Sequence, residues 1–185
     1  IKKTSGIEIG LIGSVAGGEF LQNQSHNIFP SAYPSAGWNN QVKNDLCLQY
    51  SAVIEKGLLN LPWFEINGLI GGKLGIPHTE ADIGSSFRIG YFKDYFRGIG
   101  IDIFSGWQAW LYCSGSIFLV NYNASLQGGT INQESVHTIL YINNSLLHAS
   151  FGGVLQYKRL CVKYGMEVRS PEFPDAFWHR WGHLN

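Results

Sequence analysis

The chain has 185 residues, 45% of them hydrophobic and 14% charged, and its 13 basic residues balance its 13 acidic residues. This length is enough for one domain with a sizeable core, and the lack of net charge or of a basic block argues against nucleic acid as a partner. No run of about 18 apolar residues occurs, so no transmembrane helix is predicted. Few charges, 14% aromatic residues and 23 glycines are typical of a membrane β-barrel, but also of a soluble sandwich or barrel.

Polar and apolar residues alternate along much of the chain, which predicts an all-β protein with antiparallel strands. Between Leu46 and Ile54 every second side chain is apolar or aromatic, and between Leu160 and Val168 such residues alternate with Cys, Lys, Gly and Glu. A charged face opposite an aliphatic face fits a barrel with a polar lumen in lipid. A water-soluble barrel would invert the two faces, and the alternation alone does not distinguish them. Strands are expected at 7–13, 46–54, 63–74, 83–92, 107–121, 147–157 and 160–168.

Turn residues separate these segments. Junctions are predicted at 60–62, 75–77 and 94–100, where Pro or Gly interrupts the alternation. The adjacent charges Lys158 and Arg159 mark a tight hairpin turn or serve only solubility. The irregular stretch 127–144 is long for a compact barrel, and connections of that length are usually functional or mobile.

One segment near the N-terminus has a helical period instead. A helix over Glu19–Ile28 places Glu19, Gln22, Asn23 and His26 on one face. These polar side chains are unsuited to a hydrophobic core. They can, however, hold an imidazole in one tautomer with its second nitrogen free, as a general base requires. The alternative is a solvated helix face that carries a surface histidine.

Two glycines precede this helix. The peptide N–H groups around Gly17 and Gly18 could bind an anion such as a phosphate or a developing oxyanion at the helix start. Equally, the glycines could only permit the turn from strand to helix.

The sequence gives little support for disulfide bonds, a cysteine metal site or a serine nucleophile. Cys47, Cys113 and Cys161 lie far apart, which argues against both a disulfide framework and a metal knuckle. Serine has no G-x-S-x-G motif to support it as a nucleophile, so water activated by His26 is the better hypothesis. Interface or structural roles are expected for the other histidines, which are His78, His137, His148, His179 and His183.

The order and spacing of several motifs resemble the outer-membrane lipid A 3'-O-deacylases, the LpxR-like family. In the N-terminal part they are GLIG at 10–13, AGG at 16–18, QNQSH at 22–26, and Trp38 with Gln41. Further along they are NASLQGG at 123–129, LQYKRL at 155–160 and HRWG at 179–182. The resemblance therefore touches nearly the whole chain.

This resemblance implies an antiparallel transmembrane β-barrel in the bacterial outer membrane, with its aliphatic face toward lipid. It implies lipid A or lipopolysaccharide as the substrate and hydrolysis of an ester-linked acyl chain, with His26 as the catalytic base. On the helix face described above, and not from the resemblance, Glu19, Gln22 and Asn23 would orient the imidazole or line the site. The alternative is a catalytically inactive barrel, or a soluble β-barrel that binds an apolar ligand.

The resemblance also shows departures from the family. The family is a twelve-stranded, calcium-dependent barrel, and residues 1–185 have room for about seven or eight strands of it. We therefore expect a single domain, the C-terminal part of the full barrel, with its targeting signal upstream. No metal ligands are identified in this chain, and those for calcium are expected in the missing N-terminal strands, together with an Asn-Asp pair and a Lys. Ala32 stands where some members carry a Glu, and whether Glu19 substitutes for that Glu is a hypothesis.

Overall fold

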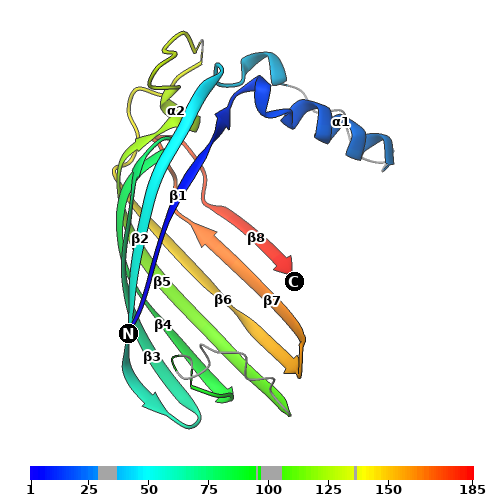
Figure 1. Ribbon diagram of the computed structural model, residues 1–185, viewed down its shortest axis with the longest axis vertical. Helices are drawn as coiled ribbons and strands as arrows, with labels where there is room; N and C mark the ends of the chain where they lie inside the picture. The colour runs from blue at the N-terminus through cyan, green and yellow to red at the C-terminus, as the bar shows by residue number, and fades with distance from the viewer. Residues whose placement is uncertain (29–36, 95, 97–105, 136) are drawn as a thin grey trace.

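The computed structural model describes residues 1–28, 37–94, 96, 106–135 and 137–185. They form one antiparallel sheet of eight strands, in which each strand pairs with its neighbours in sequence. The sheet is strongly curved (Figure 1), and within the described residues its edge strands β1 and β8 do not pair with each other. The strands are β1 (Lys2–Ile12), β2 (Asp45–Leu61), β3 (Phe64–Gly75), β4 (His78–Tyr91), β5 (Trp107–Asn123), β6 (Ser145–Tyr157), β7 (Leu160–Arg169) and β8 (His179–Leu184).

The all-β antiparallel fold predicted from the alternation is therefore confirmed, with corrections at the ends of elements. β1 begins at Lys2 rather than Ile7, because the irregular KKTSG segment pairs along its whole length with β2. β8 was not predicted, since its short aromatic sequence has no clear alternation, but it pairs with β7. None of the helices within the described residues is long and apolar enough to cross a membrane.

Within the described residues, four short helical elements lie between the strands. The predicted helix is present as α1 (Gly18–Ile28), but the single-helix prediction was incomplete. The structure adds α2 (Ala124–Gln127) and the 3₁₀ helices η1 (Ser14–Ala16) and η2 (Trp38–Asn40). The side chain of Asn123 caps α2 by accepting a hydrogen bond from the backbone N–H of Ser125 at 3.0 Å. An Asn at this position is a common N-cap, and that was the available sequence signal.

Apart from β8, the strands present one mainly apolar and one mainly polar face, as predicted. On the outward face, Ile70, Ile83, Ile117 and Leu147 form a continuous row across four strands, and all four are exposed. On the inward face, a polar row of five residues crosses five strands. Its members are Asn67, Ser86, Ser114, Ser150 and Glu167. Because the apolar residues are exposed and many polar ones buried, the pattern is the reverse of a water-soluble protein and fits a barrel wall in lipid.

Ion pairs join neighbouring strands on the inward face. Arg88 Nε lies 2.6 Å from Glu65 Oε2, and the Glu65 side chain is only 1% exposed. Lys73 Nζ lies 2.8 Å from Glu80 Oε1. Both pairs are direct cross-strand partners, so their charges reinforce the register that the alternation sets.

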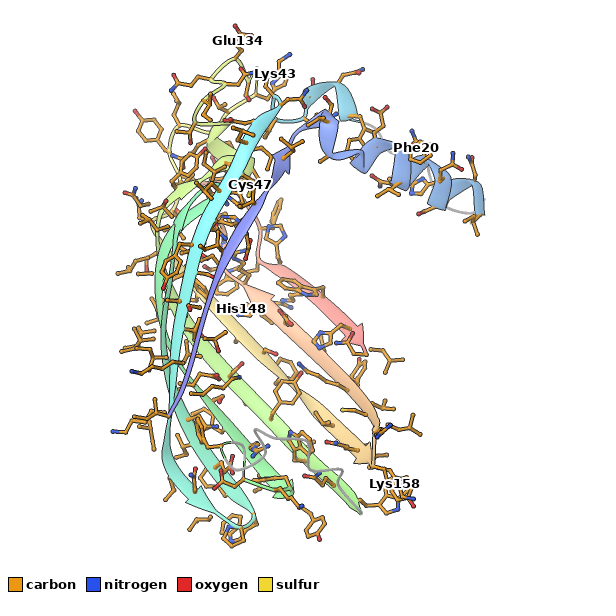
Figure 2. All side chains as sticks on the ribbon, in the orientation of Figure 1. Phe20, Lys43, Cys47, Glu134, His148 and Lys158 are labelled. Atoms are coloured by element: carbon orange, nitrogen blue, oxygen red, sulfur yellow. The ribbon has the colours of Figure 1, made fainter. Side chains whose placement is uncertain are left out.

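The connections lie at two ends of the sheet. The β1–β2 connection with α1 and the β5–β6 connection with α2 share one end (Figure 1), and Lys43 and Glu134 lie there in Figure 2. The opposite end holds the β6–β7 hairpin, where Lys158 has a φ of 54°, which confirms the predicted turn. The junction predicted at 94–100 lies mostly outside the described residues. We name the α1 end the rim; long loops of bacterial barrels usually face the cell exterior.

Candidate active site around α1

The start of α1 is fixed by contacts between its preceding turn and the start of β2. The side-chain oxygen of Asn44 accepts hydrogen bonds from Ser14 Oγ and from the backbone N–H of Val15, both at 2.9 Å. Gly13 has a φ of 92°, and a Cβ there would lie 2.7 Å from the same Asn44 oxygen. Only glycine fits this conformation and this close approach. The turn therefore directs the chain out of β1, and α1 projects from the rim (Figure 1).

The two glycines before the helix have identifiable conformational roles. Gly17 has a φ of 75°, and its N–H donates to the carbonyl of Ser14 at 3.1 Å. A Cβ on Gly18 would lie 3.2 Å from the Trp38 ring. The turn therefore accounts for Gly17 and the close packing of Trp38 accounts for Gly18, and the Gly17 N–H already has an acceptor. Anion binding at Gly17 and Gly18 stays a prediction.

His26 lies in the last turn of α1, as predicted from the sequence. Its ring is partly buried, whereas Glu19, Gln22 and Asn23 are all exposed. Nδ1 of His26 is buried and has no hydrogen-bond partner among the described residues. No hydrogen bond within those residues joins the imidazole to Glu19, Gln22 or Asn23, so their orienting role stays a prediction. Ala32, where some family members have a Glu, lies outside the described residues.

Apolar side chains on α1 and its preceding turn are exposed. Val15, Phe20, Leu21 and Ile28 each have more than half of their surface accessible, and Figure 2 shows Phe20 on the projecting helix. Exposed large apolar residues gathered on one short element often mark an interaction surface. The surface around His26 is thus suited to hydrocarbon as well as to water.

A hydrogen-bond network ties this region to the β5–β6 connection. The buried carboxylate of Asp45 accepts hydrogen bonds from the backbone N–H groups of Ile131 at 2.8 Å and Asn132 at 3.3 Å. The backbone N–H of Lys43 donates to Ser135 Oγ at 3.1 Å. Asn44 holds the turn before α1, whereas Lys43 and Asp45 bind the β5–β6 connection. These three consecutive residues therefore link the β1–β2 and β5–β6 connections. The sequence carried no signal for this link, since the partners are more than 80 positions apart.

A second polar cluster that the sequence did not reveal lies on the inward face. Glu167 Oε2 is 3.0 Å from His148 Nε2, and Glu167 Oε1 is 3.6 Å from His183 Nδ1. The His148 and Trp181 rings stack with centroids 6.2 Å apart. These contacts join β6, β7 and β8, which agrees with the structural role expected for His148 and His183. The cluster therefore stabilises the C-terminal edge of the sheet, where β8 is the last strand.

The described residues contain no group of three or more His, Cys, Asp or Glu side chains that could hold a metal ion. Calcium prefers six to eight oxygen ligands, several of them carboxylates. The calcium ion that the resemblance implies, with its ligands expected outside residues 1–185, stays a prediction.

Comparisons with known proteins agree with the motifs. The family model described as "Outer membrane protein LpxR" matches residues 2–185. Among solved structures, LpxR from Salmonella typhimurium is similar, with a TM-score of 0.77 and 19% sequence identity. The match covers 98% of this chain but 66% of that chain, so this chain spans slightly less than two thirds of its length. At this identity the likeness shows the fold. No curated protein matched the chain.

Proposed function

The chain belongs to the LpxR family of outer membrane proteins, and on this basis we propose that it removes an ester-linked acyl chain from lipid A in a bacterial outer membrane. The observation that carries the proposal is His26, which occupies the last position of the QNQSH motif and lies on the helix that projects from the rim. The exposed apolar face of the sheet supports placement in the membrane.

In the proposed reaction, His26 acts as the general base. One ring nitrogen of His26 takes a proton from a water molecule, and the water oxygen attacks the carbonyl carbon of the ester. The tetrahedral intermediate collapses when its carbon–oxygen bond to the sugar breaks. The imidazolium then returns the proton to the departing alkoxide, which leaves a free fatty acid and a hydroxyl group on lipid A.

The position of α1 suits a lipid substrate. Phe20, Leu21 and Ile28 are exposed on the helix that carries His26, and apolar contact with acyl chains would cover them. The helix leaves the same end of the sheet where the exposed apolar face ends, and we therefore propose that His26 meets the ester groups near the membrane surface. Glu19 is the carboxylate that we propose to orient the imidazole.

A second candidate function is a catalytically inactive barrel. It is favoured by the absence, within the described residues, of a hydrogen-bond partner for the His26 ring and of a metal-binding group. The third possibility, a soluble barrel with an apolar ligand, requires charged residues outside and apolar ones inside, and the strands have the opposite arrangement.

The test is release of fatty acid from lipid A by the full chain in lipid bilayers, followed by mass spectrometry. His26→Ala should lower the rate by about 10²–10⁴-fold, whereas Gln24→Ala, at an exposed position of the same helix, and His137→Ala should not. Full activity of His26→Ala would refute the assignment of the base. An unaltered chain that folds but releases no fatty acid would favour the inactive barrel.

A further inference from the structure

A pocket of about 630 Å³ lies at the rim, away from α1, between the β3–β4 turn and the β5–β6 connection. We infer that it binds a sugar ring of the glycolipid whose acyl chain the proposed reaction removes, a ring other than the one whose ester His26 attacks. The inference rests on the proposed function for the identity of the glycolipid. The pocket itself is argued from its position, lining and rigidity.

The position of the pocket is on the outward face, just beyond the apolar surface. Thr79 and Tyr122 pair with each other across β4 and β5, and both line the pocket. Leu74, which also lines the pocket, is 68% exposed on the outward apolar face. Since the lipid-facing residues end here, the pocket lies at the level of the polar headgroups.

The lining of the pocket is polar but uncharged. None of the described residues that form it is Asp, Glu, Lys, Arg or His. Asn121, Gln127 and Gln133 supply amide groups, each with donors and an acceptor. Leu74 and Ile76 form an apolar wall. A sugar ring has this same combination, with hydroxyls that both donate and accept and C–H faces that pack on apolar surface, whereas a phosphate would call for a cationic partner.

The walls of the pocket are held in place before any ligand binds. Tyr122 Oη donates to the carbonyl of Gly128 at 2.5 Å and accepts from Thr130 Oγ1 at 3.1 Å. Gln127 Oε1 accepts from the backbone N–H of Asn123 at 3.0 Å, which leaves its Nε2 for a ligand. Asp45 anchors the same connection from β2. Preorganised polar groups bind with less loss of conformational freedom.

Two exposed side chains of the lining allow a test with little risk to the fold. Asn121 makes no side-chain hydrogen bond within the described residues, and Gln133 makes a single long one, from Nε2 to the carbonyl of Thr130 at 3.4 Å. The variant is Asn121→Leu with Gln133→Leu. Its matched control is Asn39→Leu with Gln24→Leu, which makes the same changes at exposed positions outside the pocket.

The experiment measures binding of a soluble, deacylated and dephosphorylated glucosamine disaccharide to the full chain in detergent, by saturation-transfer NMR. Loss of two hydrogen bonds to uncharged groups should weaken binding by about 5- to 150-fold in the pocket variant, with no change in the control. Thr138→Val, at another exposed lining position, is the second variant if the first fails to fold.

Three outcomes would overturn the inference: no binding of the disaccharide, equal weakening in variant and control, or binding of inorganic phosphate in preference to sugar. The readout is independent of catalysis. If the disaccharide binds in this pocket but lipid A is not hydrolysed, the sugar site stands and the proposed function fails. If lipid A is hydrolysed but the disaccharide does not bind, the proposed function stands and the sugar site fails.

Discussion

Replacing Ile83 by arginine tests whether the outward face of the sheet lies in lipid. Ile83 is well inside β4, is 58% exposed, and pairs with two other outward isoleucines, Ile70 and Ile117. An arginine near the bilayer midplane of a barrel wall costs about 2–4 kcal/mol. This corresponds to a fall of about 30- to 700-fold in the folding equilibrium constant.

Depth along the strand provides the control. Tyr91 is the last residue of β4 and is 74% exposed, so Tyr91→Arg, near the interface, should cost about 0–1 kcal/mol. Val162 also faces outward, but it is close to the β6–β7 turn, and Val162→Arg should cost less than Ile83→Arg.

The assay is equilibrium unfolding by urea in phospholipid vesicles, followed by tryptophan fluorescence. The free energy of unfolding should fall in the order Tyr91→Arg, Val162→Arg, Ile83→Arg, from smallest loss to largest. An Ile83→Arg loss no greater than that of Tyr91→Arg would show that the outward face meets water. The soluble-barrel alternative would then have to be reinstated.

Three further predictions concern the inward face and the rim. Glu19→Gln should lower the rate of lipid A hydrolysis and shift the acidic limb of its pH profile if Glu19 orients His26, and an unchanged profile would make Glu19 a solvated helix residue. Asp45→Ala should speed hydrogen exchange of the Ile131 and Asn132 amides by about 10- to 150-fold, because hydrogen bonds to a charged group contribute about 1.5–3 kcal/mol; exchange equal to that of Glu134→Ala would contradict this. Arg88→Met should cost about 3–5 kcal/mol of unfolding free energy, since it breaks a buried ion pair, and adding Glu65→Gln should recover part of it; no recovery would mean that the two side chains are not energetically coupled.

Much of the candidate site was predictable because it is local in sequence. The helix that carries His26 follows from its 3.6-residue period and from the two glycines before it, and both are properties of neighbouring residues. The partners of the imidazole were not predictable. Glu19 lies seven positions before His26 in the sequence, yet no hydrogen bond joins the two in the structure, because a shared helix face brings side chains near without aiming them at each other.

The sequence by itself determined which strand face is polar and which apolar, because successive side chains point to opposite sides of a strand. It also determined the positions of tight turns such as Lys158-Arg159. Only the tertiary structure decided what meets across the sheet: Glu65 with Arg88, Asp45 with the β5–β6 connection, and the uncharged pocket at the rim. These contacts depend on register and on how far the sheet curves. Both are set by the pairing of all eight strands, so no single segment of the sequence encodes them.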